Sequence, residues 1–463
     1  MNDMTVGSNE RPLRRRGVHL STRHTFLLAA LLLSVGTRAR ADDAPTTKSA
    51  PTPEQARGLE SPERASAAED AALFVPRVLL FVPRLVLTVA FLPLQHGLRA
   101  ASRQFRSNGG QAVHDDVRTV AVLPHVSYAS GFGTTFGIAA RYENLGGYGE
   151  EAALTAGLGG VYAQFADVAL RADRTAGQPI WLESRTRYEI RPAQVFQGVG
   201  DGSSAVESRY REDRLTAVAR GGVTIGEDKH LVRAGGSLVF DGSSFGPKDD
   251  TYSAAPSTPS VYDTRDLPGF DRGVKTVEAQ MNLFIDTRDE VAATSSGVLA
   301  SAFVGAVPAL QRYGYGHLGF DVSGAIDLYK KNRVLVLRAA FEGVVGERAD
   351  IPFTRLARLG GEGSLRGYFV DRFRDRESAL VSAEYRYPIH EVVAAAVFVD
   401  AGHVAPDPAS LTAFSRWRAG GGAGLRIRTK DATLASLDLA YGDAVQLFFT
   451  VFPFDSRAQW NKP

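Results

Sequence analysis

One arginine and two acids near the C-terminal end of the chain have the types and the spacing for a shared ion pair. Period-2 alternation places Glu384 on the polar set of one predicted strand and Asp400 on the same face of the next strand. Arg366 lies in the long segment that precedes both strands. A planar guanidinium matches carboxylate geometry, so we expect Arg366 to reach both acids. Gly367 lets the chain turn beside it where a side chain could not.

Signals of enzymatic chemistry are weak. The pattern G-x-S-x-G occurs at Gly242 to Gly246, but a nucleophile elbow needs a strand-to-helix turn. We expect this stretch to lie in a Gly/Ser/Asp/Pro-rich loop, Asp241 to Arg272. The nine histidines form no H-E-x-x-H, and there is no cysteine. We therefore predict no catalytic site, cofactor or metal; the alternative, a hydrolase inside a barrel, requires a serine and a histidine on one face.

The elements that carry the charged residues are predicted to be strands. From about Val117 onward apolar and polar residues alternate with period 2, as in Val277 to Asp286. Strands of this length match a bilayer, and a sheet in lipid has to close because an open edge leaves backbone groups unpaired. The sequence therefore predicts an all-β fold over residues 117–454: a transmembrane antiparallel β-barrel of about 16 strands. The last six strands are expected at residues 332–346, 378–388, 392–402, 416–428, 432–442 and 445–454, with ten more between about 118 and 328.

Three zones precede the predicted barrel. Residues 1–41 read as a signal peptide, with a basic stretch, a short apolar run and the site Ala39-Arg40-Ala41. Residues 42–69 read as a disordered linker. Residues 70–116 form an apolar, amphipathic periplasmic segment that begins with a heptad written twice, Phe74 to Leu80 and Phe81 to Leu87. Its prolines and arginines disfavour spanning, so we expect it to lie on the membrane or dock on the protein; a buried helical hairpin is the alternative.

The amino-acid composition limits the kinds of partner that the chain could bind. The chain has 463 residues with 53 Lys+Arg against 51 Asp+Glu, a net charge of +2, which argues against a nucleic-acid binder. The mean hydropathy of −0.12 is too polar for a helical membrane protein. Because the signal peptide takes the chain out of the cytoplasm and the strands match a bilayer, we expect its partner to be membrane lipid, with no nucleic acid.

Four stretches, in this order and spacing, resemble a known family. They are Phe196-Gln197-Gly198-Val199-Gly200-Asp201, Asp286-Thr287-Arg288-Asp289, Leu365-Arg366-Gly367-Tyr368, and the pair Ser382 to Ile389 with Phe398-Val399-Asp400-Ala401-Gly402. The chain from about Val117 to Phe454 resembles the bacterial surface antigen (BamA/TamA-like) superfamily of outer-membrane barrels. The family's mark is an R-G-[FY] motif in a long loop folded back into the lumen. The resemblance implies that Arg366, Gly367 and Tyr368 hold this loop against Glu384 and Asp400, and that Asp286, Arg288 and Asp289 form a strand-end motif.

The resemblance also implies a place and a function. Members of this family insert other barrels into the outer membrane or move polypeptide across it, and they usually carry periplasmic POTRA domains. Residues 42–116 hold the linker and the doubled heptad, so we expect no POTRA domain and assign the chain to the POTRA-less branch. The expected function is insertion or translocation, with the barrel-assembly machinery and a periplasmic protein as partners. A structural or diffusion pore is the alternative.

The last predicted strand is expected to close the barrel and to carry the assembly signal. Val445, Leu447, Phe449 and Val451 form its lipid-facing set, and Phe452 and Phe454 follow as interfacial aromatics. Phe449, Phe452 and Phe454 are therefore the predicted signal. Residues 455–463 form a polar tail.

Overall fold

The computed structural model describes residues 119–451, apart from residues 176, 201–205, 227–230, 311, 330–332, 391 and 429–432. The predicted signal peptide, linker, apolar segment and polar tail lie outside the described residues, as do Phe452 and Phe454.

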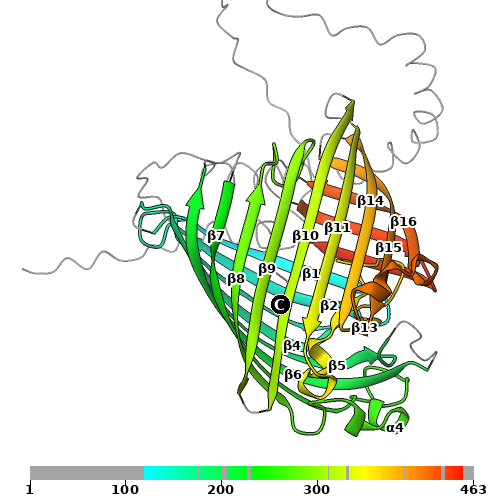
Figure 1. Ribbon diagram of the computed structural model, residues 1–463. Coiled ribbons are helices and arrows are strands. Elements are labelled where there is room, and N and C mark those ends of the chain that lie inside the picture. The colour runs from blue at the N-terminus through cyan, green and yellow to red at the C-terminus, as the bar shows by residue number, and fades with distance from the viewer. Residues whose placement is uncertain are drawn as a thin grey trace, which may run out of the picture. The chain divides into compact units, whose positions relative to one another are not determined.

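Sixteen strands form one closed antiparallel barrel (Figure 1). Neighbours in the sheet are neighbours in the chain, except that β11 pairs with β14 and β18 pairs with β1. The barrel strands are β1 (Thr119–Ala129), β2 (Gly133–Glu143), β3 (Glu151–Gly159), β4 (Tyr162–Ala172), β5 (Ile180–Phe196), β6 (Ser208–Ile225), β7 (Leu231–Pro247), β8 (Val274–Asp286), β9 (Gly297–Leu310), β10 (Tyr313–Tyr329), β11 (Arg333–Val345), β14 (Glu377–His390), β15 (Val393–Ala405), β16 (Arg418–Arg428), β17 (Thr433–Tyr441) and β18 (Val445–Val451). The predicted fold is confirmed, because ten strands precede β11 and the last six begin within one residue or two of their predicted starts.

Two small elements lie inside one connection. β12 (Ala357–Leu359) and β13 (Phe373–Asp375) form a separate two-stranded sheet between β11 and β14. The helices among the described residues are single turns: α4 (Thr258–Val261), η2 (Thr264–Asp266), η3 (Arg348–Asp350), η4 (Phe353–Arg355), η5 (Ala409–Thr412) and η6 (Phe414–Arg416). Within the part of the chain that the structure describes, no helix is long and apolar enough to cross a membrane.

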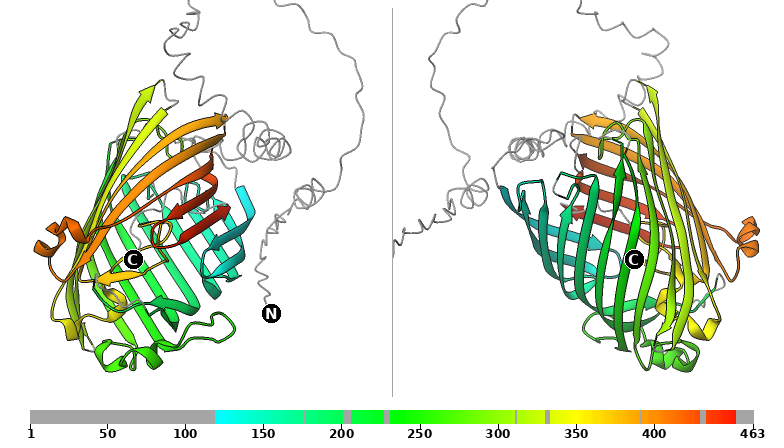
Figure 2. Two further views of the ribbon diagram at one scale, coloured as in Figure 1. Left: turned by 90° about the vertical axis from the view of Figure 1, so that its right-hand side faces the viewer. Right: turned by 60° about the vertical axis from the view of Figure 1, so that its left-hand side comes forward.

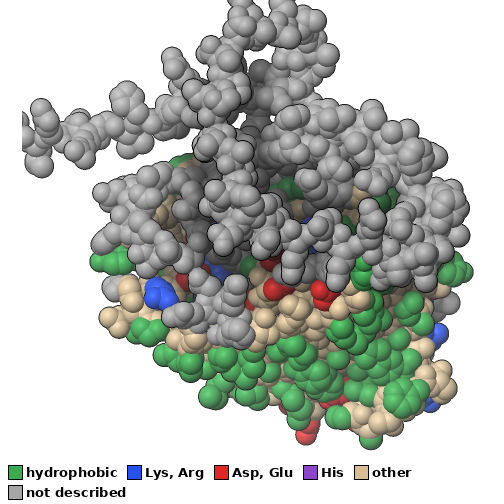
Figure 3. Space-filling model, turned by 90° about the horizontal axis from the view of Figure 1, so that it is seen from above, with side chains coloured by type: hydrophobic (Ala, Val, Ile, Leu, Met, Phe, Trp, Pro, Cys, Tyr) green, Lys and Arg blue, Asp and Glu red, His purple; other side chains and the backbone are tan. Residues whose placement is uncertain are grey.

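The two faces of the wall differ in the way the alternation requires. Outward side chains are apolar and exposed, for example Met281 at 72%, Val397 at 55% and Val399 at 59%. Inward neighbours on the same strands are charged or polar and buried, for example Glu278 at 8% and Asp400 at 0%. Figure 3 shows hydrophobic side chains gathered over the outer wall where described residues are visible. Such a wall suits lipid outside and a polar lumen inside.

The antiparallel order gives the barrel two distinct ends. We call "terminal end" the one where β1 starts, which also carries the turns β10–β11 and β14–β15. The "loop end" carries the long connections, residues 248–273 and 346–376, with α4 and β13 (Figure 2). β5, β6, β7 and β10 have 17 or 18 residues, which exceeds the 9–11 residues that a bilayer requires. Their extra length lies at the loop end for β5, β6 and β7, where their aromatic residues pack with the long connections.

One local expectation was wrong. The G-x-S-x-G stretch lies within β7, which continues to Pro247, and only the residues after it form a loop. Ser243 and Ser244 occupy ladder positions opposite Val274 of β8 and Asp213 of β6. The strand persists here, despite the turn-like composition, because β6 pairs with it as far as Pro247, while β8 pairs with it as far as Ser243.

Candidate functional site

The longest connection of the loop end, residues 346–376, is the candidate functional site. It leaves β11, passes through η3, η4 and β12, and returns through β13 to β14. Its tip, residues 360–372, contains the R-G-Y motif. Leu365 and Tyr368 of the tip pack in an apolar cluster with Phe373, Leu380 and Val404. These contacts seat the tip on the inner faces of β14 and β15.

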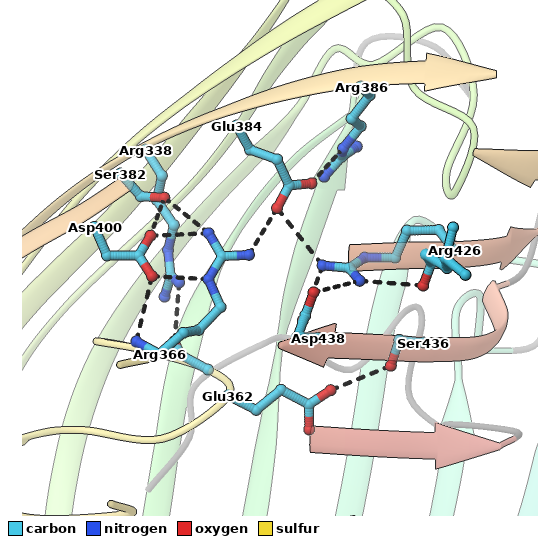
Figure 4. Close-up of polar contacts among 12 residues, drawn as sticks. Arg338, Glu362, Arg366, Ser382, Glu384, Arg386, Asp400, Arg426, Ser436 and Asp438 are labelled. Atoms are coloured by element: carbon cyan, nitrogen blue, oxygen red, sulfur yellow. Dashed lines mark hydrogen bonds and ion pairs between the residues drawn. The ribbon is translucent and has the colours of Figure 1, made fainter. Parts of the chain in front are cut away.

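The guanidinium of Arg366 lies between two carboxylates of the wall (Figure 4). Its Nε donates to Asp400 Oδ2 at 2.8 Å and its Nη2 to Asp400 Oδ1 at 2.8 Å, a bidentate pair. Its Nη1 donates to Glu384 Oε2 at 2.7 Å. Arg366, Glu384 and Asp400 are 7%, 6% and 0% exposed, so all three are withdrawn from solvent. Short, charge-assisted bonds of this kind are among the strong ones in proteins.

Two wall residues that the sequence did not single out complete this contact. Ser382 Oγ donates to Asp400 Oδ1 at 2.6 Å and accepts from Arg366 Nη2 at 3.3 Å. The ring of Phe398 lies under the guanidinium, with Arg366 Cζ 3.4 Å from the ring centroid. Strand alternation already places Phe398 on the face of Asp400, and that signal could have found it. A desolvated cation–π contact adds roughly 2 kcal/mol to a site of this kind.

Close backbone packing holds the residue after the arginine. A Cβ on Gly367 would lie 2.6 Å from Gly442 N and 2.7 Å from Tyr441 C, closer than real Cβ atoms come. A Cβ on Gly420 of β16 would lie 3.2 Å from Gly367 Cα. Next to this contact, Tyr368 Oη donates to the carbonyl of Ala419 at 3.1 Å. Glycine is therefore required at position 367 by close packing against the wall; the expectation that the turn requires it is wrong, because Gly367 does not have a positive φ.

The tip reaches beyond β14 and β15. Glu362 accepts from Ser436 Oγ of β17 at 3.2 Å and from Thr450 Oγ1 of β18 at 3.4 Å. Arg338 of β11 pairs with Asp321 and donates from Nη1 to the Gly363 carbonyl at 2.9 Å. Figure 4 shows Arg338 and Ser436 on opposite sides of the Arg366 contact. The tip is thus bound to the inner wall from β11 to β18.

The base of the loop is bound to the other side of the barrel. Arg374 of β13 is 1% exposed, donates to the Val195 carbonyl of β5 at 3.1 Å and lies 5.1 Å from the Phe196 ring centroid. Gly200 N donates to the Arg374 carbonyl at 2.9 Å. Phe353 packs among Phe196, Tyr210, Leu267 and Phe270. The F-x-G-V-G stretch therefore supports the base of the loop, and the loop joins β5 to β14–β18 inside the lumen.

The D-x-R-D stretch lies at the other end of the barrel, in the turn from β8 to β9. Arg288 pairs in a bidentate manner with Asp286, through Nε at 2.9 Å and Nη2 at 2.7 Å. Asp289 accepts from Ser295 Oγ and from the N–H groups of Glu290, Ser295 and Ser296 at 2.9–3.1 Å. Arg428 of β16 donates to the Ala292 carbonyl at 3.3 Å. Because four strands separate β9 from β16 in the sheet, the turn reaches over the terminal-end mouth.

We expect Asp289 to control the stability of this turn. Burial opposes its ionisation, but the hydrogen bonds from Ser295, Ser296 and Glu290 outweigh burial and lower its pKa to about 2. The unfolded value is about 3.9, so the ionised carboxylate stabilises the turn above about pH 4 and this contribution is lost as the pH falls toward 2. At pH 6 Asp289→Ala should speed amide hydrogen exchange of residues 290–297 by about tenfold, which corresponds to ~1.4 kcal/mol.

The control is Asp263→Ala, since Asp263 caps η2 at the loop end and accepts from Arg265. It should leave the exchange of residues 290–297 unchanged. Equal acceleration by both substitutions would contradict a local role for Asp289.

Of the predicted assembly signal, only Phe449 is among the described residues. It lies on β18 opposite Tyr128 of β1 and Leu437 of β17, while its neighbour Phe448 is 2% exposed. The alternation therefore places Phe449 on the outer face beside the seam between the first and last strands. Among the described residues no group of three His, Cys, Asp or Glu side chains could hold a metal ion.

Comparison with known proteins gives one family. The model of the Omp85 superfamily domain matches residues 144–446. No curated protein sequence matches the chain. Among solved structures, BamA from Haemophilus ducreyi lacking POTRA domains 1–3 is similar, with 16% identity and a TM-score of 0.51 over 72% of this chain and 70% of that chain. CdiB from Acinetobacter baumannii has 13% identity and a TM-score of 0.47 over 74% of this chain and 60% of that chain. At 16% identity the similarity to the BamA structure shows a shared fold.

Proposed function

Since the chain belongs to the Omp85 superfamily, we propose that it inserts or translocates polypeptides at the outer membrane through a barrel whose lumen the 346–376 loop occupies at rest. The family consists of insertases and transporters, which gives the class of activity. The terminal end faces the periplasm in this proposal, and the loop end faces outward. The outer wall contacts membrane lipid.

The observation that carries the proposal is the loop bound on both sides of the lumen. Arg366 and Glu362 attach its tip to β14, β15, β17 and β18, and Arg374 attaches its base to β5. A passive diffusion pore needs a free path, whereas this connection occupies the inner wall with buried ion pairs. The arrangement favours a lumen that opens only when these contacts are released.

A periplasmic partner completes the proposal. The composition of residues 42–116 is that of a linker and an apolar segment. We infer that a separate periplasmic protein brings the unfolded substrate, and that the barrel-assembly machinery inserts this chain itself.

The test is reconstitution of the purified full chain in liposomes. An unfolded small outer-membrane barrel is added, and its folding is followed by heat-modifiable mobility and protease resistance. We expect folding on the order of tenfold faster than in empty liposomes, which corresponds to ~1.4 kcal/mol of activation free energy. Steady ion conductance by the same liposomes without accelerated folding would support the diffusion pore instead. In cells, depletion of this protein should lower the amounts of other outer-membrane proteins, measured by a census of these proteins.

A further inference from the structure

Four apolar side chains at the terminal end of β14–β17 are buried, although strand alternation places three of them, Ile389, Val393 and Ile427, on the outer wall. Ile389, Val393, Ile427 and Leu434 are 8%, 5%, 9% and 5% exposed, and they pack together. We call them the terminal-end patch. Val393 shares its face of β15 with Val397 and Val399, which are 55% and 59% exposed, and it pairs with Ile427 of β16.

The edges of the terminal-end patch are irregular. The register between β14 and β15 shifts at Pro388/His390, next to Ile389. The register between β16 and β17 shifts at Ile427/Arg428, which leaves Leu434 without a partner on β16. β-Bulges redirect side chains and bend the strand locally. Ile389 faces outward by the alternation of β14, whereas Leu434, which alternation alone would place with Asp438, packs with Val393 and Ile427 beside the register shift.

Among the outward apolar residues of the terminal end that the structure describes, burial of this degree occurs on β14–β17. Outward apolar residues of other strands at this end are exposed, namely Val120 at 60%, Ile225 at 62%, Val298 at 40% and Leu328 at 52%. Leu328 is informative because the turn that follows it, between β10 and β11, is also very short. A short turn therefore does not bury the outward residues beside it. The terminal-end patch needs a cover that the other strands lack.

We propose that the doubled heptad, Phe74 to Leu87, packs on the terminal-end patch as an external segment of the same chain. The heptad pair is the most apolar stretch between the predicted signal peptide and β1, and it offers Leu, Val and Phe to Ile, Val and Leu of the wall. Arg77 and Arg84 occupy the same position of each heptad, so they lie on a recurring side. That side reaches the lipid headgroups while the apolar side contacts the barrel.

The chain has the reach for this contact. β1 starts at the terminal end, and β18 and β17 separate it from β16. Three strand spacings of about 4.8 Å amount to ~15 Å along the wall. Residues 88–118 can extend far beyond this distance at ~3.3 Å per residue. The segment and the terminal-end patch therefore belong to the same membrane interface.

Cysteine cross-linking of the full chain tests the proposal, because the native chain has no cysteine. One partner is Val393→Cys in the terminal-end patch, and the control is Val399→Cys. Both lie on β15 and face outward, about 20 Å apart along the strand. Each is combined with a cysteine at Leu85, Val86 or Leu87, which together sample the sides of the heptad. The protein is oxidised in liposomes after heat-modifiable mobility has shown that the barrel is folded.

We expect an intramolecular disulfide with Val393→Cys for at least one heptad position, and none with Val399→Cys. Disulfides between two copies would show that a second chain covers the terminal-end patch and would overturn the proposal. No disulfide at either position, or equal disulfides at both, would overturn it as well. The rate of labelling by a lipid-soluble maleimide is a second measurement. The single variant Val393→Cys should react at least tenfold more slowly than the single variant Val399→Cys. Both readouts report proximity and are independent of the proposed transport activity.

Discussion

Arg366→Ala should give a barrel that folds but loses its heat-resistant form at a lower temperature and is cut by protease within residues 361–368. The substitution removes four hydrogen bonds donated by the guanidinium. It leaves Asp400 buried without the guanidinium that pairs with it, whereas Glu384 keeps its pair with Arg386. Removal of one partner of a buried pair costs ~3–5 kcal/mol. The measurements are the temperature at which the compact form disappears in a detergent gel, and the cleavage sites of a protease of broad specificity.

The conservative variant and a double-mutant cycle make this test specific. Arg366→Lys keeps the charge but loses the bidentate geometry and the planar stack on Phe398, so it should restore only part of the stability. Asp400→Asn should reproduce the loss, and the double variant should cost less than the sum of the single ones by ~0.5–3 kcal/mol. Strict additivity would reject a direct contact. Arg185→Ala is the matched control, because Arg185 faces the lumen and pairs with Asp167 away from the loop.

Gly367→Ala should displace the loop tip as effectively as removal of the arginine. The new methyl would overlap the backbone of Tyr441 and Gly442, which connects β17 to β18 and cannot move aside as a flexible side chain could. Overpacking of this kind costs ~1–3 kcal/mol by itself, and the shift also lengthens the Arg366 hydrogen bonds. We expect the same protease cleavage and heat sensitivity as for Arg366→Ala, with little further loss when both substitutions are combined.

Gly442→Ala should produce the same phenotype from the wall side, since its Cβ would meet the Gly367 carbonyl oxygen at 2.6 Å. Gly246→Ala serves as the control, because a Cβ there has no atom within 4 Å. If Gly367→Ala keeps the compact form and the protease resistance of the native chain, close backbone packing does not hold the loop.

The strands could be predicted from the sequence because the wall separates two solvents. Outward residues face lipid and inward residues face a polar lumen. Apolar and polar residues therefore alternate with a period of 2 along each strand. The same alternation places Glu384 and Asp400 on one face, which is why Arg366 could be assigned partners before their distances were known. The length of β5 to β7 could not be predicted in this way, since their loop-end extensions lie outside the bilayer and pack against connections distant in the sequence.

Contacts between segments that are distant in the sequence could not be predicted from the alternation of apolar and polar residues. The fit of Gly367 against Gly420 and Gly442 depends on backbone distances, and glycine in a strand carries no sign of its neighbour. The Arg374–Val195 bond depends on which side of the lumen the loop crosses. Neither of these two contacts produces a periodic pattern in the sequence, because both depend on how the closed barrel brings separate strands together.

The two attachments of the loop also set an order of events during folding. The tip pairs residues 34 positions apart, Arg366 with Asp400, so it forms once β14 and β15 have met. The base pairs residues 179 positions apart, Arg374 with Val195, and it needs β5 and β6 in the same sheet. Closing such long stretches of chain is slow, and the contacts they allow form late. The backbone amide that reports the base is that of Gly200, which donates to the Arg374 carbonyl. Its protection in pulse-labelled refolding should therefore trail that of β14 and β15, and the loop completes its attachment only after the N-terminal strands have joined the C-terminal ones.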